Sequence, residues 1–207
     1  MSTPEQNAGG RSATPTGPRA RHDKQHTRDT IRAAALRLFT EQGFKRTTVE
    51  QIARDADVSH MTVFRHFPTK EAIILDDDLG PAIEEIVRAL PRGLTVFDCA
   101  RQLVTGVYQL GARDPWASNP QRRHLIDREP ELRAAAQAQE DNGFAGTAQF
   151  FADYTGRRPE DLPIRVFSAA LTGVLVHVAR YVDDPAEPGT LDEMLRALDL
   201  LEQGLPL

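Results

Sequence analysis

The chain has 207 residues, of which 40% are hydrophobic and 27% charged, a composition that suits one ordinary hydrophobic core or two small ones and excludes a chain disordered throughout. Its net charge of −5 is unevenly distributed, because residues 1–70 hold 12 lysines and arginines against 7 acidic residues while residues 71–207 hold 13 against 23. The chain has no apolar run of about 18 residues and no apolar N-terminal segment, which excludes a membrane span and a signal peptide and leads us to expect a cytoplasmic protein.

The first 23 residues are rich in glycine, proline, serine and threonine and hold almost no large apolar side chain. Such a composition cannot bury enough surface to offset the entropy that is lost on ordering. We therefore expect a disordered basic arm over residues 1–23. The sequence leaves open whether this arm is a solvated tail or lies along a polyanion.

The first helix is predicted from Thr27 to Gln42. Its apolar side chains recur at the spacing that gathers them on one face of a helix: Ile31, Ala34, Ala35, Leu38 and Phe39. Gly43 then accepts the left-handed conformation of a helix C-cap, and Phe44 supplies the apolar contact that often accompanies such a cap.

Two short helices joined by a tight turn follow. The second helix spans about Thr48–Ala56, and its first residue has the spacing of a capping box with Gln51. Ser59 caps a third helix, about His60–His66, which Pro68 closes because proline disfavours helical geometry in the residue before it. This pattern predicts a helix-turn-helix.

Thr69 opens a longer fourth helix that runs to about Leu90 and that Pro81 must kink or interrupt. Five further helices follow between breaks marked by proline: about Thr95–Ala112, Pro120–Asp127, Glu131–Tyr154, Pro163–Val182 and Leu191–Gln203. No segment alternates apolar and polar residues as a strand does. We expect an all-α fold, with a three-helix helix-turn-helix domain over residues 24–70 and a larger helical domain over residues 71–207.

Signatures of catalysis and metal binding are absent. The sequence holds no phosphate-loop, dinucleotide-binding, zinc-protease or nucleophile-elbow motif, and its one cysteine, Cys99, has no partner for a disulfide or a zinc pair. His22 and His26 have the spacing of metal ligands but no third ligand nearby. The acidic run Asp76–Asp78 is more typical of a solvated turn than of a cation site. We expect no enzyme, no metal and no cofactor.

The third helix carries binding chemistry on its outer face. Val63 and Phe67 pack inward, which leaves cations, hydroxyls and a thioether outside: His60, Met61, Thr62, Arg65 and His66. Arginine pairs with guanine, threonine and methionine contact the thymine methyl group, and histidine can meet a base edge or a phosphate. These residue types suit the major groove of DNA.

Phosphate-binding groups accompany this face. Thr48 and Ser59 begin two helices whose first backbone N–H groups can bind phosphates, and Lys70 adds a charge at the start of the fourth helix. The excess of positive charge lies in the same part of the chain, whereas the remainder is acidic. The sequence therefore indicates a DNA-binding head on an acidic body.

This segment resembles the DNA-binding domain of the TetR family of one-component transcriptional regulators. The resemblance covers about a quarter of the chain and is carried by the runs Ile31–Phe39, Gly43–Phe44, Thr47–Ala53, Val58–Ser59 and Thr62–Ala72. It implies a homodimer of about nine helices per subunit that reads a palindromic operator. It also implies a variable C-terminal body that binds a small effector, and repression that the effector relieves, although the family includes activators.

Nine residues match positions that contact DNA in such proteins: Thr48, Ser59, His60, Met61, Thr62, Phe64, Arg65, His66 and Lys70. Two residues depart from the family pattern. Phe64 stands where tyrosine is usual and lacks the hydroxyl that would bond a phosphate. Asp57 stands where glycine is usual in the turn, so a left-handed backbone there carries some strain. DNA binding is expected, with weaker anchoring per half-site.

A dimer through the C-terminal helices is expected. The helix from Pro163 is apolar on most sides, and the last helix carries an apolar stripe: Leu191, Met194, Leu195, Leu198 and Leu201. Two subunits could join such stripes in a four-helix bundle. The pattern alone fits an intrachain core equally well, and the family resemblance favours the interface.

Candidate effector-binding residues are the large side chains of the body: Phe97, Leu103, Tyr108, Trp116, His124, Phe144, Phe150 and Phe151. Each also fits a plain core position. The stretch Gly143–Gly146 weakens its helix and is typical of a kink beside a cavity. We expect a hydrophobic or amphipathic small molecule that shifts the fourth helix and with it the recognition helix.

Three alternatives remain open at the level of sequence. The protein could be an activator of the same family, or an all-α enzyme or ligand-binding protein whose basic head is incidental. A nonspecific architectural DNA protein is disfavoured by the acidic body. Specific operator binding with a steep salt dependence separates a regulator from the enzyme.

Overall fold

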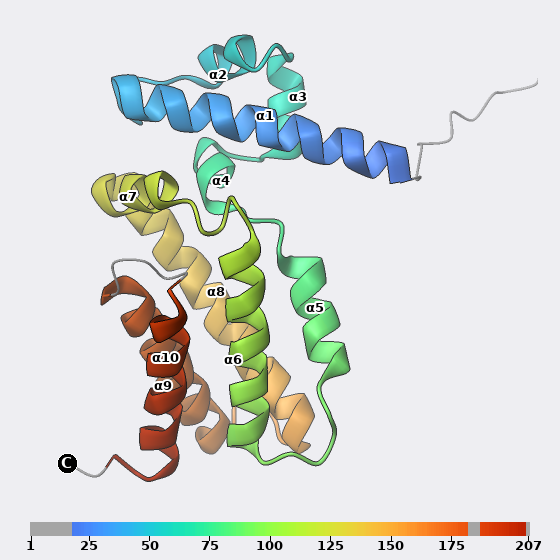
Figure 1. Cartoon of the computed structure of the whole chain (residues 1–207), viewed down its shortest axis with the longest axis vertical. Coiled ribbons are helices and arrows are strands. Elements are labelled where there is room, and N and C mark those ends of the chain that lie inside the picture. Colours follow the sequence, from blue (N-terminus) through green and yellow to red (C-terminus); the bar gives the residue numbers. More distant parts are fainter. Residues whose placement is uncertain (1–17, 182–186, 206–207) are drawn as a thin grey trace, which may run out of the picture.

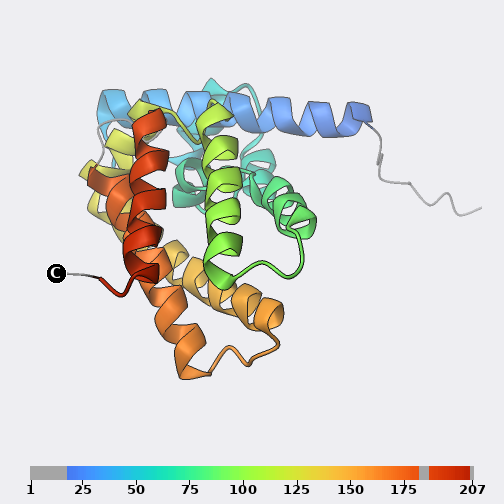
Figure 2. The ribbon, with the colours of Figure 1, turned by 60° about the horizontal axis from the view of Figure 1, so that its bottom comes forward.

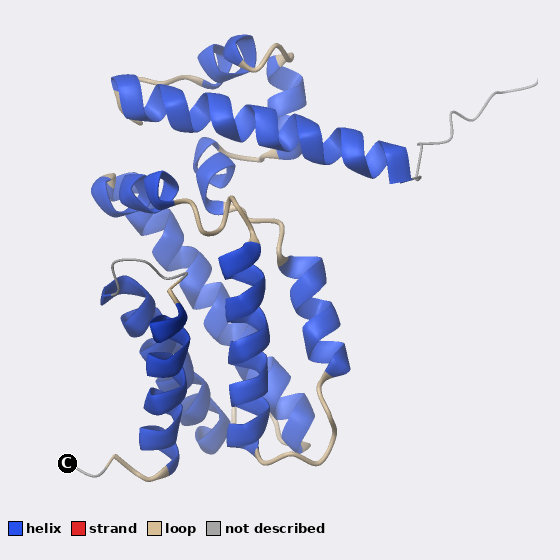
Figure 3. Cartoon of the chain, in the orientation of Figure 1, coloured by secondary structure: helices blue, strands red, loops and turns tan. Residues whose placement is uncertain are grey.

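The computed structural model describes residues 18–181 and 187–205, which form helices and loops without a strand (Figure 3). The helices are α1 Pro18–Gln42, α2 Val49–Asp55, α3 His60–His66, α4 Lys70–Leu75, α5 Gly80–Ala89, α6 Val96–Arg113, α7 Pro120–Arg128, α8 Pro130–Thr155, α9 Leu162–Tyr181 and α10 Pro188–Glu202. No helix in these ranges combines the length and the apolar character needed to cross a membrane.

Two parts are stacked along the long axis of the molecule (Figure 1). We call α1 to α4 the head and α5 to α10 the body. In Figure 1, α1 to α3 lie at one end, α4 points from them toward the body, and α7 lies below α1. The turned view shows α6 and α10 side by side, in agreement with their close backbone packing (Figure 2). The all-α prediction is confirmed over the residues described.

The helix-turn-helix forms as predicted. The Thr48 hydroxyl accepts from the Gln51 N–H at 3.3 Å while the Gln51 side chain accepts from the Thr48 N–H at 2.8 Å, a complete capping box. The Ser59 hydroxyl accepts from the Thr62 N–H at 3.1 Å at the start of α3. Local sequence therefore determines where α2 and α3 begin, because each capping side chain accepts a hydrogen bond from a backbone N–H that has no partner within its helix.

A residue with a left-handed backbone follows α1, and another follows α2. Gly43 has φ +88°, and its N–H donates to the Phe39 carbonyl at 3.0 Å, so it ends α1 as expected. Asp57 has φ +52° in the turn between α2 and α3. Both positive φ values were predicted, and Asp57 carries the strain that glycine avoids.

The predicted start of the first helix was wrong. α1 begins at Pro18, so residues 18–23, assigned to the disordered arm, are helical; residues 1–17 lie outside the described part. Apolar periodicity begins only near Ile31, but arginine, alanine, lysine and glutamine propagate a helix without it, and proline suits the first turn. The end at Gln42 was predicted correctly.

The fourth helix is interrupted earlier than predicted. α4 ends at Leu75 and α5 starts at Gly80, with Pro81 in its first turn. Asp78 between them has φ +63°, which no α-helix tolerates. The described residues therefore form ten helices rather than about nine. The remaining five helices begin and end within three residues of their predicted bounds.

Each part has an apolar core. The head core includes Phe39, Phe44 and Phe67 and continues into the body through Leu125 of α7 and Leu132 of α8. The body core gathers side chains from α6, α8, α9 and α10: Cys99, Ala100, Val104, Ala148, Phe151, Ala152, Ile164, Leu171 and Leu198. Because the head core extends into α7 and α8, the head packs on these two helices.

The apolar stripe of the last helix faces this second core. Leu198 is fully buried, and Leu191, Met194, Leu195 and Leu201 are half-buried against the same cluster. The stripe therefore packs on the body core of its own chain, Leu198 completely and the other four side chains in part. This is the intrachain alternative that the sequence left open, and the exposed parts of these four side chains stay available to a second subunit.

Candidate functional site

The outer face of α3 is exposed and firmly supported from behind. Val63 is 1% exposed and Phe67 is fully buried in the head core, whereas Met61 is 65% and Phe64 43% exposed. Burying large apolar side chains on one face fixes the rotation of a seven-residue helix that has little stability of its own. The face that the sequence singled out is therefore presented to solvent.

Phe64 and His60 form a pair on this face. Their rings meet edge to face with centroids 5.8 Å apart. With Met61, which is 65% exposed, the Phe64 ring gives this face an apolar part beside its cations. The absent hydroxyl leaves Phe64 with apolar contact as its means of binding.

The hydroxyl groups around α3 are engaged in local bonds. Ser59 and Thr62 hydroxyls lie 2.9 Å apart, and Ser59 also caps the helix. Thr48 is likewise committed to its capping box. These side chains hold the two helix N-termini in place, and their backbones are what they offer to a partner.

Two predicted contact residues are partly buried. The Lys70 ammonium donates to the Phe44 carbonyl at 2.9 Å and to the Thr47 carbonyl at 3.3 Å, and it lies 4.0 Å from the centre of the Phe44 ring. Burial lowers the pKa of His66, and the positive charges of Arg28, Arg65 and Lys24 act in the same direction. Lys70 therefore has a structural role that the sequence did not indicate, and the His66 ring is less readily protonated than an exposed histidine.

A cavity of about 620 Å³ lies in the body between α5, α6, α8, α9 and α10. Its wall is mostly aliphatic: Ile83, Val87, Leu103, Val104, Val107, Tyr108, Gly143, Gly146, Thr147, Phe150, Leu171, Thr172, Leu175, Val176 and Met194. Hydroxyl groups come from Tyr108 and two threonines, and no residue of this wall carries a charge. The cavity suits an uncharged apolar group.

Three of the eight predicted effector residues line this cavity: Leu103, Tyr108 and Phe150. The Tyr108 hydroxyl also donates to the Glu187 carbonyl at the start of α10. Gly143 and Gly146 lie in the wall, beside a cavity as predicted, and their helix runs unbroken from Pro130 to Thr155.

The other five lie outside the wall of this cavity. Phe97 and Phe151 pack on Phe167 with ring centroids 5.2 and 4.8 Å away; Phe151 is fully buried in the body core, whereas Phe97 is half-buried. Trp116 and His124 lie at the junction of head and body, and Phe144 is half-buried on α8 away from the wall. Aromatic content does not distinguish a cavity wall from a filled core, because both are apolar.

Most aliphatic residues of the wall, with the exception of Leu103, were not predicted from the sequence. Ile83 and Val87 on α5, four residues apart, face the cavity. On α8 the lining residues Gly143, Gly146, Thr147 and Phe150 follow the spacing of one helix face. This spacing was visible in the sequence, but only the packing of five helices shows which apolar faces leave space between them.

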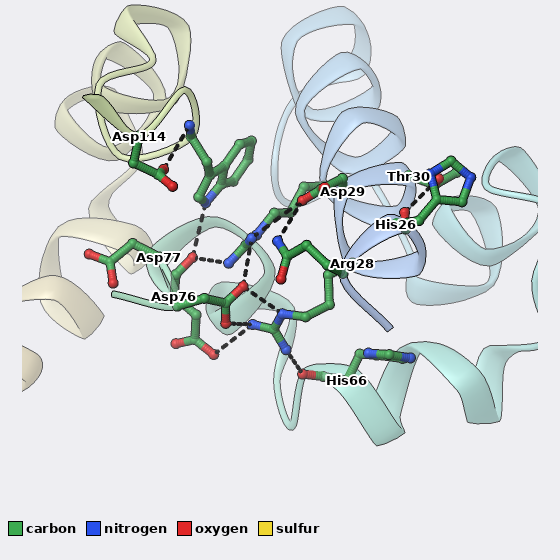
Figure 4. Close-up of polar contacts among 12 residues, drawn as sticks. His26, Arg28, Asp29, Thr30, His66, Asp76, Asp77 and Asp114 are labelled. Atoms are coloured by element: carbon green, nitrogen blue, oxygen red, sulfur yellow. Dashed lines mark hydrogen bonds and ion pairs between the residues drawn. The ribbon is translucent and has the colours of Figure 1, made fainter. Parts of the chain in front are cut away.

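The acidic turn Asp76–Asp78 is ion-paired with α1, in contrast to the solvated turn expected (Figure 4). Arg28 donates through Nε to one Asp78 oxygen at 2.8 Å and approaches the other through Nη2 at 2.7 Å. Its Nη1 donates to the carbonyl of His66, the last residue of α3, at 2.5 Å. Arg32, only 2% exposed, pairs with Asp78 at 2.9 Å and donates to the Asp76 carbonyl at 2.6 Å.

Side chains of the body complete this junction. The Trp116 indole N–H donates to the Asp76 carbonyl at 2.9 Å, and Arg122 donates to the carbonyls of Ile74 and Leu75 at 2.6 and 2.7 Å. These bonds satisfy the last carbonyls of α4. Burial raises the pKa of Asp76, although the nearby arginines act in the opposite direction. In the described ranges no group of three or more His, Cys, Asp or Glu side chains is placed to hold a metal ion.

Two family profiles match the chain. Residues 31–76 match the profile of bacterial regulatory proteins of the tetR family, and residues 94–206 match the MftR C-terminal domain. The first match runs from the middle of α1 to Asp76, directly after α4, and the second covers α6 to α10 of the body.

Known proteins agree with these profiles. The chain is 48% identical over 64 residues to the HTH-type transcriptional regulator TcmR of Streptomyces glaucescens, covering 30% of this chain and 28% of that protein. It is 37% identical over 83 residues to the HTH-type transcriptional regulator HbdR of Aromatoleum sp. strain CIB, covering 39% and 34%. The match therefore spans about a third or less of either curated relative.

A solved structure matches over nearly the whole chain. Thermus thermophilus FadR, a TetR-family transcriptional repressor in complex with lauroyl-CoA, is 26% identical, with a TM-score of 0.54 over 87% of this chain and 95% of that one. The families and relatives that match are transcriptional regulators rather than enzymes.

Proposed function

Because this chain belongs to the TetR family of bacterial regulatory proteins, we propose that it is a one-component transcriptional regulator that binds an operator through α3. The observation that carries the proposal is the outer face of α3, where Met61, Phe64 and Arg65 are exposed on a helix locked from behind by buried apolar residues. A rigid helix with a mixed cationic and apolar face suits the major groove.

We assign the contacts by chemistry. Arg65 pairs with guanine or a phosphate, while Met61 and Thr62 meet thymine methyl groups. Phe64 and His60 add ring contacts, and the N-termini capped by Thr48 and Ser59 bind phosphates. Lys70 has one ammonium proton beyond its two carbonyl bonds, which it can give to a phosphate, and His66 contributes from the end of α3.

The proposed regulator is a homodimer joined through its C-terminal helices. Leu162 and Val166 on α9 are 67% and 58% exposed, one turn apart, and Leu200 on α10 is also exposed. A groove of about 810 Å³ runs between the same two helices. A second copy that buries these side chains would form a four-helix bundle and present two recognition helices to a palindrome.

The effector we propose is a hydrophobic or amphipathic small molecule with a long apolar chain that relieves repression. The aliphatic wall of the 620 Å³ cavity supports this class, and the related FadR was solved with lauroyl-CoA. We propose that the apolar chain lies inside and a charged group of the effector outside, because the wall carries no charge.

Binding-site selection from random duplex DNA tests the proposal. We expect the purified protein to enrich a palindrome with half-sites about one helical turn, or a multiple of it, apart. Its affinity should fall linearly with salt on logarithmic axes. Enrichment of no sequence at low salt would contradict the regulator and favour an all-α ligand-binding protein or enzyme.

A further inference from the structure

Helix α5 connects the cavity to the acidic turn. Ile83 and Val87 of this helix form part of the cavity wall, and its first residue lies two positions after Asp78. A ligand that displaces α5 therefore acts on Asp78 through two peptide units. The break after Leu75 prevents α4 and α5 from moving as one rigid rod.

Asp78 in turn holds the end of the recognition helix. Both of its carboxylate oxygens bind Arg28, whose remaining nitrogen bonds the His66 carbonyl. Arg28 is 8% exposed, and its guanidinium carbon lies 4.1 Å from the centre of the Phe67 ring. The Asp78 side chain is 33% exposed and also pairs with Arg32 at 2.9 Å. The two bonds to Asp78 keep the Arg28 side chain in place, because separating the pair would leave the buried arginine charge without this partner.

The rest of the turn is fixed from the other side. Trp116 and Arg122 bind the carbonyls of residues 74–76, so the end of α4 is tied to the body near α7. Asp78, with its left-handed backbone, lies beyond these anchors on the α5 side. Movement of α5 thus reaches the head at Asp78 before it reaches α4.

We propose that Asp78 and Arg28 are a positioning pair that transmits the position of α5, and hence the occupancy of the cavity, to the C-terminal end of the recognition helix. The pair does not touch DNA or effector. It aligns α3 when α5 is close to α6 and releases the His66 carbonyl when α5 is pushed away. This inference rests on the proposed function, because its readout is operator affinity.

Gly106 of α6 provides a way to move α5 without a ligand. A Cβ at this position would lie 2.9 Å from Cγ2 of Ile86 on α5, closer than real contacts allow. Ile86 is β-branched and stiff in a helix, so its side chain cannot rotate aside freely and α5 must shift. Gly106→Ala therefore imitates displacement by a ligand. Gly111→Ala is the matched control on the same helix, since a Cβ there meets nothing within 4 Å.

The test is a double-mutant cycle on operator affinity, measured by fluorescence anisotropy with the selected palindrome. We expect Gly106→Ala to weaken operator binding about fivefold or more, within the usual range of coupling between sites, while Gly111→Ala leaves it unchanged. In an Asp78→Asn background the effect of Gly106→Ala should fall below about twofold, because the link is already broken. Asparagine tolerates the left-handed backbone.

Asp77→Asn is the control for charge. It makes the same charge change one residue away, and its side-chain oxygen can still accept from the Leu79 N–H, as Asp77 does at 3.1 Å. It should leave the Gly106→Ala effect intact. Thermal unfolding and affinity for nonspecific DNA are measured for every variant. Neither quantity is expected to change in the pattern that operator affinity shows across the double-mutant cycle. Arg28→Gln breaks the same pair from the other side if Asp78→Asn does not fold.

Two results would overturn the inference. One is additivity, in which Gly106→Ala weakens binding by the same factor with and without the Asp78–Arg28 pair. The other is an operator affinity for Gly106→Ala equal to that of Gly111→Ala. Either result leaves the regulator function standing, whereas failure of the unmodified protein to enrich any operator would remove the proposed function itself.

Discussion

The backbone and the ring of His66 have different environments at the end of α3. Its carbonyl is held by Arg28, while its ring is partly buried and its Nδ1 atom has no hydrogen-bond partner. Burial, followed by the charges of Arg28, Arg65 and Lys24, lowers the pKa of the imidazole. The ring is therefore neutral in the free protein near neutral pH, and protonation there is unfavourable.

A pH dependence of stability follows from this lowered pKa. The unfolded chain binds a proton on His66 more readily than the folded one, so the free energy of unfolding decreases as the pH falls below about 6.5, the ordinary histidine value. His66→Gln removes this titrating group. As the pH falls from 7.5 to 5.5, the free energy of unfolding should therefore decrease less in the variant than in the unmodified protein. Urea unfolding at several pH values measures the difference. Parallel pH curves would show that His66 does not contribute.

At the scale of elements, the short helices of the head depend on their caps and turns. α2 and α3 have seven residues each, too few to be stable alone. A capping box begins α2, the left-handed Asp57 follows its end, and the Ser59 hydroxyl caps the start of α3. The same local rules failed at two helix ends. α1 starts earlier than predicted, because good helix formers extend it without apolar periodicity. α4 ends earlier than predicted, at Leu75, and the four residues 76–79 separate it from α5.

The turn between α2 and α3 can be improved. Asp57→Gly should raise the free energy of unfolding by about 0.5 kcal/mol, because glycine relieves the strain at φ +52° but adds entropy to the unfolded chain. Arg54→Gly, in the helical last turn of α2, should instead lower it by about 1 kcal/mol. Chemical denaturation compares the two. A loss of stability in Asp57→Gly would mean that the aspartate side chain stabilises this turn.

At the scale of the whole molecule, the two apolar cores and the 620 Å³ cavity arise from how the described helices pack. The head core reaches into α7 and α8, and the acidic turn is paired with α1, so the two parts are joined by both apolar and ionic contacts. The cavity forms where α5, α6, α8, α9 and α10 leave space between apolar faces.

Filling this cavity from α8 tests its role. Gly146 lies in the wall, and an added Cβ meets nothing within 4 Å, so Gly146→Leu should fold while it occupies the space. Lauroyl-CoA serves as the probe of the effector class proposed above, and under that proposal this variant binds it at least about tenfold more weakly than the unmodified protein in calorimetry, a change near 1.4 kcal/mol. Its thermal stability should not fall, because leucine favours a helix more than glycine does. Gly111→Leu, outside the cavity, is the control, and equal affinities would place the ligand elsewhere.

The sequence by itself determined the helical class, the helix-turn-helix with its caps, the bounds of most helices and the exposed face of α3. These features are local, because hydrogen bonds between residues three or four apart and the apolar periodicity of one helix decide them. The Val63 and Phe67 side of α3 could be identified in the same way.

Only the tertiary structure decided which apolar faces meet, since an apolar side chain does not specify its neighbour. It packed the stripe of α10 against the body core, placed Phe151 inside that core, and placed Ile83 and Val87 in a cavity wall. It also paired Asp78 with Arg28 across 50 residues, where the sequence showed an acidic turn and a basic helix but not their contact. Long-range ion pairs and empty space depend on the packing of whole helices, and no local pattern records them.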